Sequence, residues 1–334
     1  MHLCWADVTP SVPRMKDDGT DGSRLAATVL ASPGAGQSRQ SRAAGVALML
    51  ASSTSNQTGA AAGALAFPEI GPVGVIAIRQ VVTALVLTPI VRPRLRSLTG
   101  HQIRPIIALA LVFSVMNVSL YAAVERVGLA MAVTLEFLGP LAVAIGSSRR
   151  SRDMCAAVLA GAGVLVLTHP GVNTDVLGVG LALIAAASWA SYILLNRAVG
   201  ARVEGLHGTA VASLVAAACW VPVGASWFAA HPPTPRAIAY AAACGVLASV
   251  IPYVTDLMAL RRVPTHVFGI FASMNPVCAA VAGTVVLGQI PSIPEWAGIA
   301  MIVGSNVLVT VMASDTGSHD GGSQEARPRR YRTL

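Results

Sequence analysis

The stretch VGLAMAVTLEFLGPLAVAIGSS, from Val127 to Ser148, decides the class of fold. About 20 consecutive apolar residues are enough to span a bilayer as a helix. Glu136 lies near the centre of the stretch, where an ionisable side chain costs about 2.5–3.5 kcal/mol on insertion scales and therefore usually faces a polar cavity. Pro140 frees the backbone carbonyl of Glu136, which predicts a kink at this point. A kinked spanning helix with a buried acid is typical of a transporter.

The composition of the whole chain agrees with a membrane protein. Hydrophobic residues make up 54% of the 334 residues and charged residues 11%, with a mean hydropathy of +0.66. Few soluble proteins have such a composition, so the chain is predicted to be an all-α polytopic membrane protein. The net charge of +8 would suggest nucleic-acid binding in a soluble protein. Here most arginines lie in tails and short loops, where they act as topology signals and indicate no nucleic-acid partner.

Motifs for nucleotide, metal or nucleophile chemistry are absent from the sequence. The chain has no P-loop, no Rossmann glycine fingerprint, no HExxH and no serine elbow. Its five cysteines have neither metal-ligand nor disulfide-framework spacing, which favours a packing role. We therefore expect no cofactor, no metal and no enzymatic activity. An integral membrane enzyme acting on a lipid phosphate remains a weaker alternative, because the chain lacks the interfacial cluster of acids, arginines or histidines that such chemistry needs.

Ten apolar segments are predicted between two polar tails. An even number of spans places both termini on the same side of the membrane. Every Lys and Arg other than Arg79, Arg126 and Arg236 falls on the face that carries the termini, so both termini are predicted to be cytoplasmic. The predicted spans are residues 44–66, 72–91, 105–124, 128–147, 154–170, 176–195, 208–229, 237–259, 265–287 and 295–313.

The two halves of the chain resemble each other weakly. ERVGLAMAVTLEFLGPLAVAI (125–145) aligns with RRVPTHVFGIFASMNPVCAAV (261–281) at an offset of 136, which places Pro140 on Pro276. At almost the same offset, ALMLASSTSNQT (47–58) lies over ALIAAASWASYI (182–193). Each half has five spans, and an odd number of spans inserts the halves in opposite orientations. Inverted repeats of this kind place a binding site near the midplane, at the repeat interface.

This pattern divides the chain into four parts. Residues 44–170 and 176–313 are the two predicted five-helix repeats. Residues 1–43 are rich in Asp, Arg, Ser, Gly and Pro and are expected to be a disordered cytoplasmic tail. No apolar core follows a basic start there, so a signal peptide is not predicted. Residues 314–334 are expected to be a second disordered tail, basic and cytoplasmic.

Several longer segments carry a family resemblance. They are AVTLEFLGPLAVAIGSSRR (132–150), ASWASYILLNRAVGA (187–201) and IPYVTDLMALRRVPTHVFGIFASMNPVCAAVAGTVVLGQ (251–289), supported by NQTGAAAGALAFPEIGPVGVIAIR (56–79) and MNVSLYAAVERVGLAMA (116–132). Over about residues 44–313 the chain resembles the drug/metabolite transporter superfamily with its paired EamA domains, and most closely the bacterial threonine/homoserine exporters. The resemblance implies ten transmembrane helices in two inverted EamA-like repeats.

The chain also departs from that family pattern. Asn275 precedes Pro276 where similar members usually have Glu, and Gln289 stands where they usually have a second Glu. Ala64 replaces a basic residue that is often found in the first span, and Asp256 stands where Glu is common. The architecture is expected to survive these changes. The substrate does not follow from the resemblance, because lost charges can retune the cavity.

Two charged residues inside the spans are candidates for transport chemistry. Glu136 could exchange a coupling proton or pair with a substrate ammonium group, since burial of a carboxyl group favours its neutral form. The alternative is a structural acid. Arg79 lies about seven residues into the second span and could clamp a substrate carboxylate by two hydrogen bonds, or pair with Glu136. The alternative for Arg79 is a side chain that extends to the headgroups.

Amides and aromatic rings inside the spans are the other candidates. Gln57 lies in the polar run Ser52–Thr58 and needs an interhelical partner or water. Aromatic edges and amides suit recognition of a small zwitterion, although packing and interface anchoring are alternatives for the aromatics. Asp256 is expected to form a local ion pair with Arg261 or Arg262. The predicted substrate-binding residues are Gln57, Asn117, Tyr121, Glu136, Trp189, Tyr192, Tyr253 and Asn275.

The sequence therefore predicts a secondary active exporter in the cell (inner) membrane. The expected substrate is a small amino acid such as threonine or homoserine, or a related metabolite, and the expected driving force is the proton gradient. Alternating access of the two repeats would move the substrate. An exporter of drugs or other metabolites is the alternative, and a non-transporting scaffold is a weaker one. The expected partners are the substrate, protons and the lipid bilayer, and the sequence leaves a homodimer open.

Overall fold

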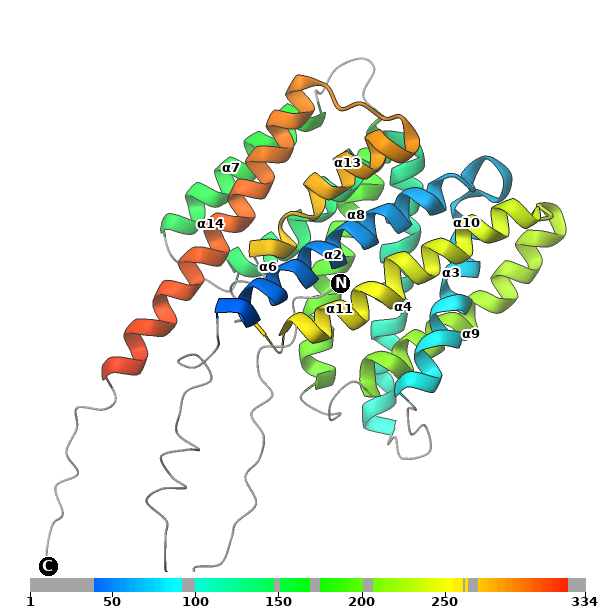
Figure 1. The fold of residues 1–334 in the computed structure, drawn as a ribbon, viewed down its shortest axis with the longest axis horizontal. Helices are drawn as coiled ribbons and strands as arrows, with labels where there is room; N and C mark the ends of the chain where they lie inside the picture. The colour runs from blue at the N-terminus through cyan, green and yellow to red at the C-terminus, as the bar shows by residue number, and fades with distance from the viewer. Residues whose placement is uncertain are drawn as a thin grey trace, which may run out of the picture.

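The computed structural model describes residues 39–91, 100–146, 151–168, 175–200, 207–260, 262–263 and 270–323, and no strand occurs among them (Figure 1). The described elements are α2 (Arg39–Ala64), α3 (Phe67–Val91), α4 (Gly100–Val127), α5 (Leu129–Glu136), α6 (Leu138–Gly146), α7 (Ser151–Thr168), α8 (Val176–Gly200), α9 (His207–Ala230), α10 (Pro235–Gly245), the π-helix η2 (Val246–Val250), α11 (Ile251–Leu260), α13 (Asn275–Leu287) and α14 (Ile293–Ser323).

Among the residues that the structure describes, eight helical spans are long and apolar enough to cross a membrane. They are Phe67–Val86, Ile103–Val127, Leu129–Gly146, Val176–Asn196, Val211–Ala230, Pro235–Asp256, Ile270–Leu287 and Ile293–Val311. The apolar part of α7, Met154–Thr168, is shorter than the others, and α2 carries the polar run Ser52–Thr58. The all-helical, multi-pass class is thus confirmed, whereas a count of ten transmembrane helices stays a prediction.

Two helices extend into the predicted tails. Helix α2 begins at Arg39, before the predicted start of the first span at residue 44. Helix α14 continues to Ser323, which lies inside the predicted C-terminal tail. The other residues of both predicted tails, 1–38 and 324–334, lie outside the described residues.

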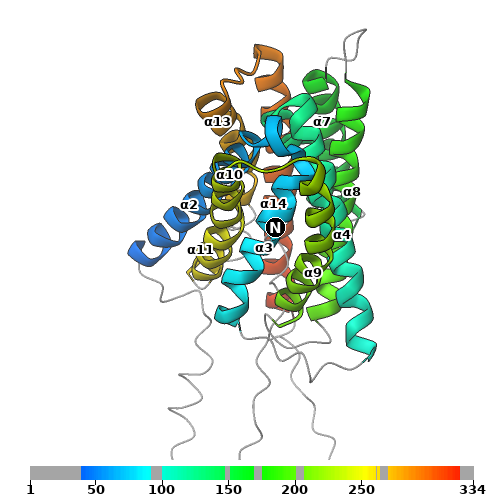
Figure 2. The same ribbon diagram turned by 90° about the vertical axis from the view of Figure 1, so that its right-hand side faces the viewer.

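The helices run alternately between two ends of an elongated bundle (Figure 1). We call the end where α2 begins and α14 ends the tail end, and the opposite end the far end. The far end carries the α2–α3 turn, the α4–α5 junction and the connection from α13 to α14. Figure 2 shows α2, α10, α11 and α13 on one side of the bundle and α4, α8 and α9 on the other.

Contacts between helices join the first half of the chain to the second throughout the bundle. Helix α4 packs on α8 and α9, α3 packs on α9 and α10, and α7 packs on α14. Helix α2 packs on α10, η2, α11 and α13, while α5 packs on α8 and α13. Gly59 and Gly63 permit the α2 contacts, because a Cβ on Gly59 would lie 2.5 Å from the backbone nitrogen of Ala248 and one on Gly63 would lie 3.0 Å from Sγ of Cys244.

Besides Gly71 near the start of α3, where φ is 63°, three of the spans contain irregular backbone. Helix α5 ends at Glu136 and α6 begins at Leu138, so the kink predicted from Pro140 is confirmed. In the second half, turn residues 273 and 274 separate residues 270–272 from α13, where Pro276 is the second residue. The third irregular segment is η2, a five-residue π-helix between α10 and α11. Such π segments are frequent at functional sites because they redirect side chains and leave carbonyls without regular helical partners.

Candidate functional site

A polar cavity of about 80 Å³ lies inside the bundle, next to these irregular segments. Its lining comes from α2, α3, α4, α5, α8, η2, α11 and the region of the turn before α13. Residues from both halves of the chain thus share one cavity. Six of the eight predicted substrate-binding residues line it together with Arg79: Gln57, Asn117, Tyr121, Glu136, Trp189 and Asn275.

Two predicted residues lie outside the cavity lining. Tyr192 is buried and packs against Phe113, with ring centroids 6.1 Å apart. Tyr253 is half-buried on α11. Trp189 and Tyr192 are three residues apart on α8, yet only Trp189 reaches the cavity. Spacing along a helix that is apolar on all sides does not determine which neighbour faces a cavity.

Glu136 is positioned by the break between α5 and α6. It is the last residue of α5, only 6% of its surface is exposed, and its side chain lines the cavity. Thr134, two residues earlier, is fully buried and returns its hydroxyl to the carbonyl of Ala130. Arg79 lines the same cavity, but no ion pair joins it to Glu136 in the described part of the chain. The carboxyl group therefore lines the cavity without a direct ion pair to Arg79.

Arg79 lies deep in the bundle, with 6% of its surface exposed. Its Nη1 donates to Oδ1 of Asn117 at 2.9 Å and to the hydroxyl of Tyr121 at 2.9 Å. Its Nε donates to Oγ of Ser249 at 3.1 Å, and Nη2 donates to the carbonyl of Ala248 at 3.4 Å. The guanidinium also lies over the Tyr121 ring, 5.3 Å from its centroid. These contacts exclude a side chain that extends to the headgroups and tie α3 to α4 and to η2.

The carbonyls of the π-helix receive side-chain donors from neighbouring helices. Ser55 on α2 donates to the carbonyl of Leu247 at 2.8 Å, and Arg79 reaches the carbonyl of Ala248. A carbonyl buried in a membrane without a partner is costly, so these donors stabilise the irregular turn. The polar run on α2 is thus partly explained by the π-helix that it contacts.

A hydrogen bond between two amides crosses the cavity wall from one half of the chain to the other. Nε2 of Gln57 on α2 donates to Oδ1 of Asn275 on α13 at 3.0 Å, and Nδ2 of Asn275 donates to the carbonyl of Ala272 at 2.8 Å. Gln57 is 97% buried, since only 3% of its surface is exposed. The interhelical partner that Gln57 needs inside a span is therefore Asn275.

Trp189 contributes a donor that the protein leaves unused. Its ring packs edge-on against Phe137 with centroids 4.7 Å apart, which holds it beside the helix break. Its Nε1 is buried and has no hydrogen-bond partner among the described residues. A buried N–H without a partner is uncommon in folded proteins and costs free energy unless a ligand or water accepts it. The indole is therefore suited to receive an oxygen atom of a ligand in the cavity.

Sequence reasoning missed several polar residues of the lining. Ser52, Ser53 and Asn56 line the cavity beside Gln57. Asp256 also lines it and is only 4% exposed, and its local ion pair stays a prediction. Of its two expected partners, Arg261 lies outside the described residues and Arg262 donates to the carbonyl of Met258 at 2.9 Å. The signal for Asp256 was the one that identified Glu136, an acid within an apolar span.

Comparisons with known proteins agree with this architecture. Residues 176–311 match the EamA-like transporter family. The chain is 37% identical over 253 residues to the threonine/homoserine exporter RhtA of Salmonella typhimurium strain LT2, covering 73% of this chain and 83% of that protein. It is 35% identical over 277 residues to RhtA of Escherichia coli K12, covering 79% and 92% respectively. The uncharacterized transporter YwfM of Bacillus subtilis is 28% identical over 149 residues, which is 43% of this chain and 49% of YwfM.

A solved crystal structure shares the fold. It superposes with a TM-score of 0.54 at 20% sequence identity and covers 82% of this chain and 99% of its own. The helical bundle, the apolar spans and the long matches to RhtA also agree with the resemblance in the sequence. The chain belongs to the EamA-like transporter family and is a multi-pass membrane protein.

Proposed function

We propose that the protein is a secondary active exporter of small amino acids such as threonine or homoserine, or of related metabolites, driven by the proton gradient. The observation that carries the proposal is the internal cavity, which both halves line and which contains Glu136 at a helix break and Arg79 nearby. The names of the RhtA relatives support the substrate class. The protein would reside in the inner membrane with both termini in the cytoplasm.

The pattern of helix contacts supports two inverted five-helix repeats. We number the ten helical segments in chain order, so that α5–α6 is the fourth, α10–η2–α11 the eighth and α13 with the preceding turn the ninth. If the halves are repeats, each segment corresponds to the segment five places later in the chain. The contact between α4 and α8 then corresponds to that between α11 and α2, and the contact between α4 and α9 to that between α10 and α3. The contact between α2 and α13 corresponds to the contacts of α8 with α5 and α6. The contacts α3–α9, α5–α13 and α7–α14 map onto themselves. This is the pairing expected from a pseudo-two-fold axis between residues 44–170 and 176–313.

The cavity offers complementary groups for a zwitterionic substrate. Glu136 would take the ammonium group or a proton. Trp189 would donate Nε1–H to a carboxylate oxygen, because that donor has no other partner among the described residues. Arg79 already donates four of its five N–H groups, so a clamp with two hydrogen bonds would require the substrate to replace one of these partners. We propose that Arg79 acts mainly through its charge, with Asn117 and Tyr121 as the groups that it holds toward the substrate.

Competition for one carboxyl group would couple proton and substrate. Protonated Glu136 is neutral and would release a bound ammonium group, whereas ionised Glu136 would attract the next substrate. The absence of an ion pair between Glu136 and Arg79 in the described residues leaves the acid available for both partners. Transport would then proceed by alternating access of the two repeats around the cavity. The amides Gln57 and Asn275 would orient the substrate from the repeat interface.

Transport by the purified protein in vesicles tests this proposal. Proteoliposomes would be loaded in turn with radiolabelled threonine, homoserine and a panel of other amino acids, and efflux would be measured with and without an imposed pH gradient. Efflux and counterflow of threonine or homoserine that accelerate with the gradient are expected. Counterflow of drugs or other metabolites alone would support the alternative exporter. Absence of counterflow with every solute at confirmed insertion would contradict a transport function.

A further inference from the structure

The α4–α5 junction at the far end is held by the second half of the chain on two sides. Val127 ends α4, Leu129 begins α5, and Gly128 between them has a φ of 82°, a conformation that favours glycine. Leu129 is fully buried and lines the cavity. A contact that fixes this junction therefore also fixes the cavity wall at the far end.

Gln289 makes the first of the two contacts. Its Oε1 accepts a hydrogen bond from the backbone N–H of Leu129 at 3.0 Å, and a Cβ on Gly128 would lie 3.1 Å from the same oxygen. The N–H belongs to the first turn of α5 and has no acceptor within its own helix. The contact thus satisfies a backbone group of the first half with a side chain of the second half.

The backbone of Gln289 is fixed before its side chain crosses to the first half. Its N–H donates to the carbonyl of Gly283 at 3.0 Å, and its carbonyl accepts from Oγ1 of Thr284 at 2.9 Å. Gly288 precedes it with a φ of 68° and ends α13 in the left-handed conformation. The side chain is therefore presented by a rigid turn, and only its amide group joins the two halves.

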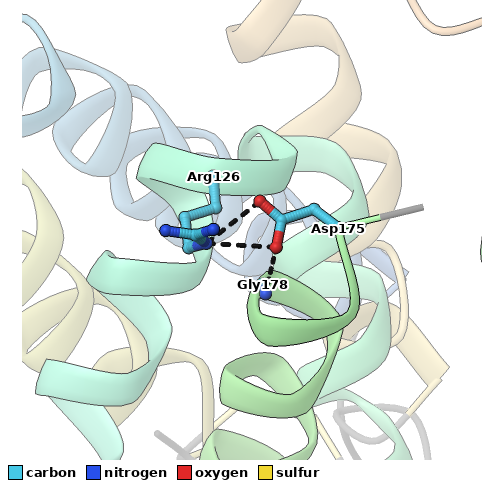
Figure 3. A network of polar contacts seen from close by, with 3 residues as sticks. All are labelled: Arg126, Asp175 and Gly178. Atoms are coloured by element: carbon cyan, nitrogen blue, oxygen red, sulfur yellow. Dashed lines mark hydrogen bonds and ion pairs between the residues drawn. The ribbon is translucent and has the colours of Figure 1, made fainter. Parts of the chain in front are cut away.

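Arg126, near the end of α4, makes the second contact, with Asp175 immediately before α8 (Figure 3). Its Nε lies 3.1 Å from Oδ1 and 3.0 Å from Oδ2 of Asp175. Asp175 also caps α8 by accepting the N–H of Gly178 at 2.8 Å. Gly178 permits a close approach, since a Cβ there would lie 2.5 Å from Cγ1 of Val127. The pair is partly exposed and is expected to be weak, so Gln289 makes the stronger of the two contacts.

We propose that Gln289 is the gate residue of the far end, with the Arg126–Asp175 pair as an auxiliary contact. In this structure the hydrogen bond is formed and Leu129 is fully buried in the cavity lining, which in this proposal is the closed state of the far end. Breaking the single hydrogen bond from Leu129 to Gln289 frees the start of α5 from the second half and opens the cavity to the far side. One neutral hydrogen bond is strong enough to bias the closed state and weak enough to break in each cycle. The inference rests on the proposed transport function.

Cysteine accessibility from the two sides of the membrane tests the gate. Ser53→Cys places a thiol in the cavity, and Ile290→Cys, at an 82% exposed position beside Gln289, marks the side that the far end faces. A charged, impermeant thiol reagent would be applied to right-side-out and inside-out vesicles. Labelling in the same chain without the added cysteine would be subtracted. Two substitutions are made in the Ser53→Cys background. Gln289→Leu keeps a side chain of similar size but removes the acceptor. Gln289→Glu keeps an acceptor for the N–H of Leu129.

The expected result is an opposite change on the two sides. Gln289→Leu should raise far-side labelling of the cavity cysteine by about fivefold, the scale of one hydrogen bond in a two-state equilibrium, and lower labelling from the tail side. Gln289→Glu should keep both rates within about twofold of the parent, because a carboxylate is also favourable at a helix N-terminus. Ser292→Ala, in the connection between α13 and α14, is the control. It removes the acceptor of the N–H of Glu295 at the start of α14 and should change neither labelling rate.

Two results would overturn the gate. Unchanged labelling in Gln289→Leu would show that the contact does not hold the cavity closed. A rise on both sides would show general loosening of the bundle instead of gating. Labelling needs no substrate, so a protein that gates but exports nothing would contradict the proposed function and leave the gate intact. A protein that exports normally with unchanged labelling in Gln289→Leu would contradict the gate alone.

Discussion

The break between α5 and α6 and the turn before α13 have the same place in their halves but different chemistry. An offset of 136 places Phe137 on Ser273, Pro140 on Pro276, and Glu136 on Ala272. Both Glu136 and Ala272 line the cavity. The proline produces the irregular backbone in each half, whereas only the first of the two breaks carries an ionisable side chain; the acid that the second half contributes to the lining, Asp256, lies on α11.

The difference indicates a division of labour between two similar scaffolds. The first break presents a carboxyl group that can gain or lose a proton. The second presents Asn275, an amide that changes no charge and that holds Gln57 across the interface. Of the two breaks, the first should therefore serve the charge-dependent steps of transport, and the second the orientation of the substrate.

The largest effect is expected from Glu136→Gln. The amide keeps the size and hydrogen bonding of the carboxyl group but cannot ionise, so export driven by a pH gradient should fall to the level of empty vesicles. Substrate exchange at equal pH should persist if the acid serves the proton, and should also be lost if the acid binds the substrate. Both rates would be measured in proteoliposomes at equal protein levels. Glu125→Gln, at an exposed position near the end of α4, is the matched control.

Wild-type rates of Glu136→Gln in both assays would remove this residue from the mechanism. Full activity would mean that the first break, like the second, supports no charge-dependent step of transport. The proposed difference between the two breaks, a proton-exchanging acid at the first and an amide at the second, would then be wrong.

A smaller but still large effect is expected from Arg79→Lys. Lysine keeps the charge but cannot donate in the planar fork that reaches Asn117, Tyr121 and the π-helix together. Transport should fall about tenfold, the scale of one lost hydrogen bond to a charged group. Initial rates of counterflow would measure the change, with Arg236→Lys, an exposed arginine that contacts Tyr240, as control. Equal losses in both variants would point to a general intolerance of lysine and not to the buried network.

The sequence predicted the scaffold better than the orientation of its side chains. Apolar length identified the spans, and Pro140 identified the break at Glu136, because both signals act locally. Which residues face the cavity depends on packing between helices that are apolar on every side. Tyr192 and Asp256 show the difficulty, since the tyrosine packs on Phe113 while the acid lines the cavity.

Polar networks were also beyond reach of the sequence. The hydrogen bonds of Arg79 join α3 to α4 and to a π-helix that no local pattern indicated. The pairing of Gln57 with Asn275 spans 218 positions in the chain. Such contacts are determined by the relative placement of the two halves, which a pattern within one segment does not specify.

A moderate effect is expected at the second break. Gln57→Ala and Asn275→Ala should each weaken substrate affinity a few fold, because the amide that remains loses its partner. In a double-mutant cycle the two changes should couple by about 0.5–1.5 kcal/mol, the net value of one hydrogen bond. Substrate affinity would be measured by calorimetric titration of purified variants, and the maximal rate of exchange should change less than the affinity. Additive effects of the two substitutions would show that the hydrogen bond does not orient the substrate.

Asp175→Asn is expected to have the smallest effect on transport, because Asp175 lies outside the cavity lining. The N–H of Gly178 and the guanidinium of Arg126 hold the pKa of the Asp175 carboxyl below its ordinary value. Because the folded pKa is lowered, the contribution of the carboxylate to stability is present above the ordinary value of about 4 and is lost as the pH falls through the lower folded value. Asn keeps the cap on α8 but not the charge, so transport at neutral pH should stay within about twofold of the parent. Melting temperatures in detergent should differ slightly at pH 7 and converge in acid, and a difference that grows in acid would contradict this assignment of the pair.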